Sequence, residues 1–379
     1  MAVELDRAAV LAHRAWAQGL TDPGAVDDLD VLTCGLQDSP AGSAALGLRQ
    51  RTGASAPLDR PELALVLTVR GSPHLHRRAD LPLLRAALWP QDNDILRAYL
   101  GGYGDELIAS GADGPRLLEQ VAAELRDVFP GETATKGELS GAVSPRLPEI
   151  ARPWCAGCGV AHVADGLFRL ATLYAGIELV PHDGRRLLFR LAPGEPKSES
   201  DNRKAATELL RTSLRVAGPA TLGDLVMWLD TRSVTAPPDW LRPSFDELSD
   251  ELVEVRAQGA PKRMYAHAEA LDRMSDAPAP PAVLLLPPRD AYTLGSRAFL
   301  VPDREVAKTV WRALGSPGTV LVDGEVAGTW RAKRAGRTLH LTVSVHRKLT
   351  AAQRTAVGEQ AEIVAATRGH EGKTEVELD

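Results

Sequence analysis

The prediction of the fold begins with one stretch, Gly35-Leu36-Gln37-Asp38-Ser39-Pro40-Ala41-Gly42-Ser43-Ala44. An apolar approach precedes the polar triplet Gln37-Asp38-Ser39, and a helical pattern that ends with Arg49 and Arg51 follows it. Ser39 is suited to cap this helix, and Pro40 to occupy its first position, because the N–H that proline lacks has no partner there. We therefore expect a helix over Pro40–Arg51.

The elements around this stretch follow a recognisable order. Helical periodicity predicts helices over Asp6–Gly19 and Ala25–Gly35, and β-branched residues predict a strand over Leu63–Val69. Three helices followed by a strand are the order of a winged helix-turn-helix. We expect a first unit of this kind at residues 1–100.

The same order of elements is expected twice more, at 101–200 and 201–276. The second unit has a capping box at Thr135 and Glu138 and a basic strand-turn-strand tip at Arg185-Arg186. The helices predicted for the two units are Pro115–Phe129, Val163–Gly176, Asn202–Val216, Ala220–Leu229 and Ser244–Leu252.

The end of the chain is predicted to be rich in strands. A helix over Thr350–Arg368 should close residues 277–370, and the polar residues 371–379 are expected to be a disordered tail. The predicted strands are Val283–Leu286, Ala298–Val301, Thr319–Val322, Glu325–Arg331 and Leu339–Val345. The fold class is thus α+β: three tandem winged helices plus a C-terminal β-rich region.

Composition narrows the class of protein. With 379 residues, 44% hydrophobic and 25% charged, the chain can form several folded domains. No apolar run is long enough to span a membrane, and three cysteines do not suggest a disulfide framework. We expect a reduced, cytoplasmic monomer that does not bind a membrane.

The net charge of −6 is unevenly distributed along the chain. Residues 303–348 contain nine Lys/Arg and four Asp/Glu, a local charge of +5, which leaves −11 for the remainder. An acidic protein of this kind can still present a basic face to nucleic acid.

Several motifs, in the right order from about Leu5 to Gly369, resemble the AlkZ/YcaQ-like winged-helix proteins. They are Gly35-Leu36-Gln37 with Pro40 and Ala44, Arg70-Gly71-Ser72-Pro73-His74-Leu75, Gly218-Pro219-Ala220-Thr221 with Asp224 and Trp228, Leu285–Tyr292, Val310-Trp311-Arg312, Val322-Asp323-Gly324, and Ala327-Gly328-Thr329-Trp330.

The resemblance implies a concave surface for double-stranded DNA and the activity of a DNA glycosylase that removes alkylated purines, in some relatives from interstrand crosslinks. The active site of the family resembles Gln, an apolar residue, then Gln or Asp. Gln37 matches the first position, whereas Asp38 stands at the middle position and Ser39 at the last.

This departure leaves two interpretations of the triplet open. Gln37 can hold a water molecule, and Asp38 has the chemistry of a base one position away from its place in the family. Asp38 and Ser39 also stand where a helix cap belongs. Gln37 itself is either a water or phosphate contact or a buried amide. The function is therefore a monofunctional glycosylase of N3- or N7-alkylated purines or, alternatively, a non-catalytic DNA-binding protein, a regulator or lesion binder. A structural scaffold that does not bind nucleic acid is a third alternative.

Basic side chains are the candidate DNA contacts. Those of the C-terminal hairpin are alternatively a solvated tip, and His74, which is close to His76, is alternatively a structural histidine. The candidates are Arg49, Arg51, Arg70, His74, Arg185, Arg186, Arg331, Lys333, Arg334 and Arg337.

One further motif is Cys155-Ala156-Gly157-Cys158 followed by His162. Its spacing is typical of half a zinc site, but a second cysteine pair is missing. The alternative is a pair of core thiols. Since no nucleotide-binding fingerprint is present, we expect no cofactor and assign no metal.

Overall fold

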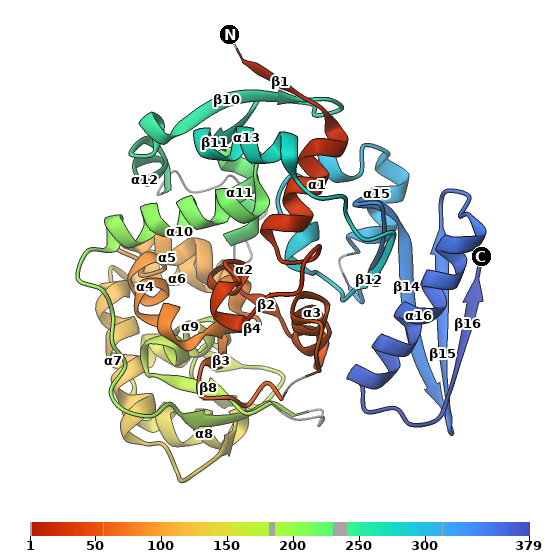
Figure 1. The fold of residues 1–379 in the computed structure, drawn as a ribbon. Coiled ribbons are helices and arrows are strands. Elements are labelled where there is room, and N and C mark those ends of the chain that lie inside the picture. The colour runs from red at the N-terminus through yellow and green to blue at the C-terminus, as the bar shows by residue number, and fades with distance from the viewer. Residues whose placement is uncertain (1, 56, 182–185, 230–240, 313) are drawn as a thin grey trace. The chain divides into compact units, whose positions relative to one another are not determined.

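The structure is a computed structural model that describes residues 2–55, 57–181, 186–229, 241–312 and 314–379. The chain divides into two compact units, each built from segments far apart in sequence (Figure 1). Unit 1 comprises Met1–Pro57, Leu210–Leu225 and Leu248–Asp379, and unit 2 comprises Leu58–Leu209 and Val226–Glu247. The predicted boundaries between the four folded domains remain predictions.

Unit 1 begins with the predicted first helix, α1 (Arg7–Ala17), which Asp6 caps by accepting the backbone N–H of Ala9 at 3.1 Å. Before it, β1 (Val3–Leu5) pairs in parallel with β10 (Leu252–Ala257), and β10 is antiparallel to β11 (Met264–His267). The start of the chain therefore completes a sheet whose other strands come some 250 residues later.

The helix predicted over 25–35 is two short elements, η1 (Val26–Asp28) and α2 (Val31–Cys34). They lead into β2 (Leu36–Gln37) and α3 (Ser43–Thr52). The helix predicted from Pro40 thus starts later, at Ser43.

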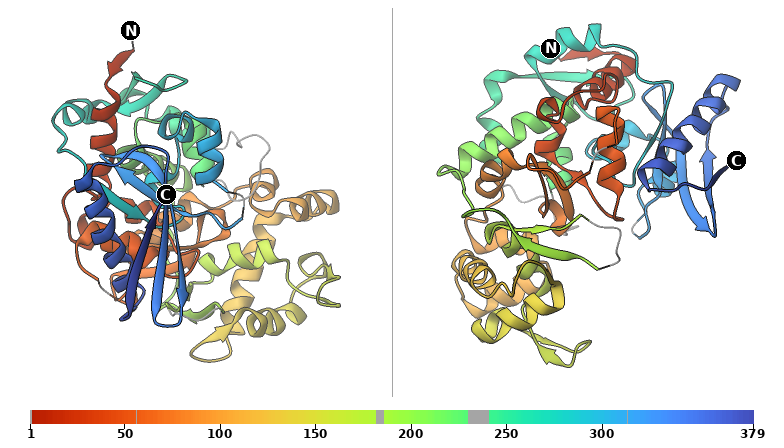
Figure 2. Two further views of the ribbon diagram at one scale, coloured as in Figure 1. Left: turned by 90° about the vertical axis from the view of Figure 1, so that its right-hand side faces the viewer. Right: turned by 60° about the horizontal axis from the view of Figure 1, so that its bottom comes forward.

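A five-stranded sheet forms the C-terminal part of unit 1, in the order β12-β13-β14-β15-β16. Alternate side chains of a strand point to opposite faces, so β12 contributes to two cores. Leu284 and Leu286 pack with residues of α1, whereas Val283 and Leu285 pack with residues of α16. The bounds are β12 (Val283–Leu286), β13 (Gly318–Val322), β14 (Glu325–Ala335), β15 (Thr338–Val345), β16 (Lys373–Leu378) and α16 (Ala351–Thr367). Figure 2 shows the long β14–β15 hairpin, in blue, from two further sides.

Two predictions for this region are wrong. The tail expected to be disordered forms β16, which pairs in parallel with β15 along its whole length. The strand expected over 298–301 is the short helix α14 (Arg297–Leu300), where Phe299 and Leu300 donate backbone N–H groups to the carbonyl of Ser296. The nearby elements are α13 (Ala268–Asp276), η8 (Ala291–Thr293) and α15 (Arg304–Val310).

Unit 2 opens with the hairpin of β3 (Leu63–Leu67) and β4 (Pro73–Arg77), which confirms the predicted strand there. A helical segment follows. Its elements are η3 (Arg78–Asp80), α4 (Leu81–Ala87), α5 (Asn93–Leu100) and α6 (Gly102–Ser110).

The next part of unit 2 has the order of a winged helix. Helices α7 (Gly114–Asp127), α8 (Lys136–Val143) and α9 (Asp165–Tyr174) accompany a three-stranded sheet. The strands run in the spatial order β5 (Ala134–Thr135), β9 (Leu188–Leu191) and β8 (Ile177–Leu179). The predicted capping box at Thr135 and Glu138 is present. The tip of the hairpin lies outside the described residues.

Of the remaining helices, the first begins at the predicted residue, the second begins two residues later than predicted, and the third begins two residues earlier and is shorter than predicted. They are α10 (Asn202–Ala217), α11 (Leu222–Leu229) and α12 (Arg242–Asp246), followed by η7 (Ser249–Glu251). Thr221 and Asp224 bond reciprocally at the start of α11, and Ala220 forms a single β-bridge to Tyr265. The α+β class is confirmed, while the number of winged-helix units stays a prediction. Among the described residues, no helix has the length and apolarity needed to cross a membrane.

Candidate functional site

The polar triplet lies at the end of β2 and before α3. Gln37 is only 6% exposed, so the fold holds its amide inside. Asp38 is half-buried, and Ser39 is exposed. The three side chains predicted as one catalytic group therefore occupy three different environments.

Gly42 occupies the N-cap position of α3, and the side chain that bonds to the start of this helix is that of Asp38, not that of Ser39. Its Oδ1 accepts the backbone N–H of Ala44 at 2.9 Å, in the first turn of α3. Burial raises the pKa of the Asp38 carboxyl, and the backbone N–H groups of Gly42, Ser43 and Ala44 oppose that rise only in part. The predicted cap at Ser39 is wrong because the helix begins three residues after Pro40.

The two arginines of α3 differ from each other. Arg51 is 0% exposed, and its guanidinium forms two hydrogen bonds to the Asp290 carboxylate, at 2.8 and 3.0 Å. It also donates to the Gly47 carbonyl and to the Gln18 side chain. The prediction that Arg51 contacts DNA is wrong, because an internal carboxylate occupies it. Arg49 is half-buried and stays a candidate.

His74, also predicted to contact DNA, is a structural histidine. It is 0% exposed, and its Nδ1 lies 2.9 Å from the carbonyl oxygen of Ser72. His76 is equally buried, with Nε2 2.9 Å from the Thr68 hydroxyl. Buried imidazoles with such partners stabilise the β3–β4 hairpin, so the prediction of a DNA contact at His74 is wrong.

The basic residues of the β14–β15 hairpin are all exposed, which fits both a DNA contact and the alternative of a solvated tip: Arg331, Lys333, Arg334 and Arg337. Arg331 donates to the carbonyl of Gly315 at 2.6 Å. Beside it lies a pocket of about 540 Å³ lined by Arg312, Arg331 and His346, with Glu305 as its acidic residue. This arrangement can hold an anion.

Strand β16 adds acidic residues next to this basic surface. Its register places Glu375 opposite His340, which itself lies opposite Lys333 on β14. The Glu375 carboxylate lies 3.1 Å from His340 and 2.6 Å from Lys373. Glu377 likewise faces Thr342. The ordered tail therefore reduces the positive potential of the hairpin.

The other predicted contacts are only partly described. Arg186 is exposed and is the first residue that the structure describes after position 181. Arg185 and the side chain of Arg70 lie outside the described part of the structure. Only the backbone of Arg70 is placed, in η2 (Val69–Gly71).

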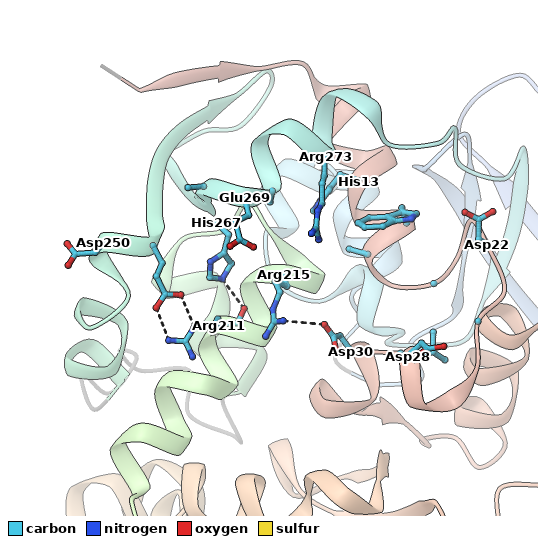
Figure 3. A pocket seen from close by; sticks show the side chains of 18 residues that line it. His13, Asp22, Asp28, Asp30, Arg211, Arg215, Asp250, His267, Glu269 and Arg273 are labelled. Carbon is cyan, nitrogen blue, oxygen red and sulfur yellow. Dashed lines mark hydrogen bonds and ion pairs between the residues drawn. The ribbon is translucent and has the colours of Figure 1, made fainter.

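A second, larger pocket of about 650 Å³ was not predicted from the sequence (Figure 3). Its walls come from α1, the following loop, α10 and α13, so no local motif marks it. Arg211 is ion-paired with Glu251 at 2.7 Å, and Arg215 lies 3.8 Å from Asp30. Its lining has six carboxylates and three arginines, so it does not suit a phosphate.

Cys155, Cys158 and His162 come together in unit 2. One ligand atom from each residue lies within 4.8 Å of the others. Cys155 is half-buried and Cys158 exposed, so the alternative of two core thiols is wrong. The hydrogen bond between Cys155 and His162, together with backbone N–H groups, lowers the pKa of Cys155 to about 7. The His162 pKa is raised, first by its bond to the Val163 carbonyl and then by Cys155.

The motifs behind the family resemblance mostly hold the fold together. The Tyr292 hydroxyl donates to the Gly324 carbonyl at 2.7 Å, and the Trp330 indole N–H donates to the Leu286 carbonyl at 2.8 Å. Asp290 is the partner of Arg51. These residues fix unit 1 from inside, and among them we identify no surface for a substrate.

Comparisons with known proteins confirm the resemblance. The profile of a family described as DNA glycosylase AlkZ-like matches residues 32–367. Among solved structures, the Streptomyces sahachiroi DNA glycosylase AlkZ is similar over 100% of both chains, with a TM-score of 0.74 and 22% sequence identity, a likeness that shows the fold. A comparison with curated proteins gave no match. Because the profile covers most of the chain, the protein belongs to the AlkZ-like DNA glycosylase family.

Proposed function

We propose that the protein is a monofunctional DNA glycosylase, acting as a monomer on N3- or N7-alkylated purines in double-stranded DNA. The observation that carries this proposal is the family membership together with Gln37 at the first position of the family's catalytic motif. The exposed basic hairpin supplies the electrostatic attraction that duplex DNA requires.

The proposed reaction is hydrolysis of an N-glycosidic bond. Water adds to the sugar carbon as the bond to the purine breaks, through a transition state with positive charge on the sugar. An N3- or N7-alkylated purine already carries a positive charge, so it departs as a neutral base without being protonated. The protein must then place the water and accept its proton.

Gln37 and Asp38 are suited to these two tasks. The amide carbonyl of Gln37 can hold the water by accepting a hydrogen bond from it. The Asp38 carboxylate can take the proton, and a raised pKa makes it a stronger base than an ordinary aspartate. Ser39 can bond to water, but its hydroxyl is a poor base.

A second function is favoured by one specific observation. Asp38 already accepts a hydrogen bond from the N-terminus of α3, and the family position that carries Gln or Asp is Ser39 here. A chain whose carboxylate only caps a helix would bind lesions or regulatory sites without cleaving the glycosidic bond.

One experiment separates the two functions. Alkylated duplex DNA is incubated with wild type, Gln37→Ala, Asp38→Asn and Ser39→Ala, and abasic sites are scored together with binding. Asparagine keeps a side-chain oxygen that can accept the Ala44 N–H but cannot act as a base. Catalysis predicts losses of about 10²–10³-fold for Gln37→Ala and Asp38→Asn, with Ser39→Ala close to wild type.

The outcomes are distinct. Full activity of Asp38→Asn with an inactive Gln37→Ala would limit Asp38 to its capping role. Binding of DNA by wild type without any release of base would overturn the glycosylase proposal in favour of the non-catalytic binder.

A further inference from the structure

The segment from Trp154 to Ala161 is a small β-knuckle that lacks a core of its own. Strands β6 (Trp154–Cys155) and β7 (Val160–Ala161) have two residues each and pair in antiparallel fashion. In this segment every residue except the half-buried Cys155 is exposed, including Trp154 at 69% and Val160 at 52%. An isolated two-stranded hairpin is marginal in water, so something other than apolar burial must hold the turn.

The turn is nevertheless sharply defined. The backbone N–H groups of Cys158 and Gly159 both donate to the Cys155 carbonyl, at 3.2 and 2.8 Å. Gly159 has φ of +68°, a conformation that favours glycine. This turn brings the two thiols and His162 together, with one ligand atom of each residue within 4.8 Å of the others.

His162 adjoins a buried, hydrogen-bonded part of unit 2. The neighbouring Val163 is buried, and its N–H donates to the Ser144 hydroxyl at 2.9 Å, while Ala164 bonds to the Ala151 carbonyl at 3.0 Å. The Nδ1 of His162 lies 2.8 Å from the Val163 carbonyl oxygen, which can only accept a hydrogen bond. Nδ1 therefore carries the proton, and Nε2 of the neutral ring is left with a lone pair, as in metal-binding histidines.

We propose that Cys155, Cys158 and His162 bind one Zn²⁺ ion, with water as the fourth ligand, and that this ion holds the knuckle in place. Two thiolates and one imidazole are ligands that zinc prefers. In a tetrahedral site their ligand atoms would lie about 3.8 Å apart, so ligand atoms within 4.8 Å of one another need only small side-chain rotations. The proposal is independent of whether the protein cleaves DNA.

The site occupies a defined place in the fold. It lies between α8 and α9, the second and third helices of the part of unit 2 that has the winged-helix order. The ion would fix Trp154 and Val160 on the surface immediately before α9. A metal would thus do for this turn what a hydrophobic core does for a larger element.

The first test measures metal content under reducing conditions, so that a Cys155–Cys158 disulfide cannot compete. Protein is produced with added zinc and purified with a phosphine reductant. We expect about one zinc per chain for wild type and a loss of most of it in Cys155→Ser, Cys158→Ser and His162→Ala. Cys34→Ala is the matched control, because Cys34 is the one remaining cysteine and is buried, and it should keep the metal.

Cobalt tests the coordination directly. Apo protein titrated with Co²⁺ should develop the intense visible absorption of a tetrahedral ion and a sulfur-to-cobalt charge-transfer band, at one equivalent. A weak octahedral spectrum, or wild-type metal content no higher than that of the Cys155→Ser/Cys158→Ser double variant, would overturn the site.

Hydrogen exchange tests the role of the ion. This experiment uses the wild-type protein alone, so its result does not depend on whether a variant folds. Removal of zinc from wild type by a chelator should increase amide exchange in the knuckle, with α7 unchanged. Unaltered exchange at the knuckle after complete metal removal would refute the claim that the ion holds it.

Discussion

Helix α3 and the β14–β15 hairpin both carry arginines that the sequence assigned to DNA, yet the fold uses them in opposite ways. On α3, Arg51 is fully buried and bonds to Asp290. On the hairpin, Arg331 and Lys333 are exposed. A positive charge in the sequence is available to a phosphate only where no internal carboxylate has taken it.

The difference has a structural cause. Arg51 follows Gly47 by one helical turn and faces the core of unit 1, where the Asp290 carboxylate offsets the cost of burying its charge. Side chains of β14 point alternately to the two faces of the sheet, so that Trp330 faces the core and Arg331 faces solvent. The buried group should therefore govern stability, and the exposed group should govern binding.

The largest effect is expected from breaking the buried pair. Arg51→Ala leaves the Asp290 carboxylate buried without its partner, which should lower the free energy of unfolding by about 3–5 kcal/mol. Urea denaturation followed by circular dichroism measures this change. Arg49→Ala, on the same helix but half-buried, is the control and should stay within about 0.5 kcal/mol of wild type. Equal losses in the two variants would contradict the comparison.

This pair also marks the limit of prediction for the fold. The caps at Asp6, Thr135 and Thr350 lie three residues from their partners, so the sequence reveals them locally. Arg51 and Asp290 are 239 residues apart, and no local pattern relates them. The same holds for the tail, whose strand β16 exists because β15 offers it an edge.

The buried histidine His13 can become positively charged, so the pH dependence of stability offers a second test of the comparison. Burial, and then the charges of Arg14 and Arg273, lower the pKa of His13 to about 4. This folded-state pKa lies below the unfolded value of 6.5. The stability that neutral His13 contributes is therefore fully present above pH 6.5 and is lost as pH falls through 4.

The expected size of this loss is about 3 kcal/mol. The difference between the free energies of unfolding at pH 7 and at pH 4 should therefore be smaller in His13→Gln than in wild type, by about 3 kcal/mol. The control is His340→Gln, since the His340 side chain is 47% exposed. An unchanged pH dependence in His13→Gln would show that the buried imidazole is not the sensitive group.

The cap of α3 should have a smaller effect on stability. Asp38→Ala removes the acceptor for the Ala44 N–H and should cost about 1 kcal/mol, whereas Asp38→Asn keeps an acceptor and should cost a few tenths. Thermal unfolding of the two variants beside Ser39→Ala measures the difference. If Ser39→Ala were the most destabilised, the sequence-based assignment of the cap would have been right.

For the candidate site, the residue types were easier to predict than their environments. Spacing alone indicates Cys155, Cys158 and His162 as possible zinc ligands, because all three lie close together in the sequence. Whether the thiols were core or surface depended on how the knuckle packs, which the spacing does not encode. Likewise, the sequence contains the two neighbouring histidines of β4 but does not predict that the surrounding sheet buries them.

The smallest effects are expected on the exposed side of the comparison, in DNA affinity. Lys333→Ala should reduce the slope of log K against log salt by about 0.9, so that the affinity of the variant falls about threefold less than that of wild type between 50 and 200 mM salt. Glu375→Gln/Glu377→Gln should act in the opposite sense and raise affinity, because the carboxylates of β16 lie beside the hairpin cations. Fluorescence anisotropy of a labelled duplex over a salt series measures both, with Arg97→Ala, which is exposed on α5, as the control. If neither the Lys333 nor the glutamine variants change the slope, the hairpin lies outside the DNA interface, and the availability of a charge is not enough to predict its use.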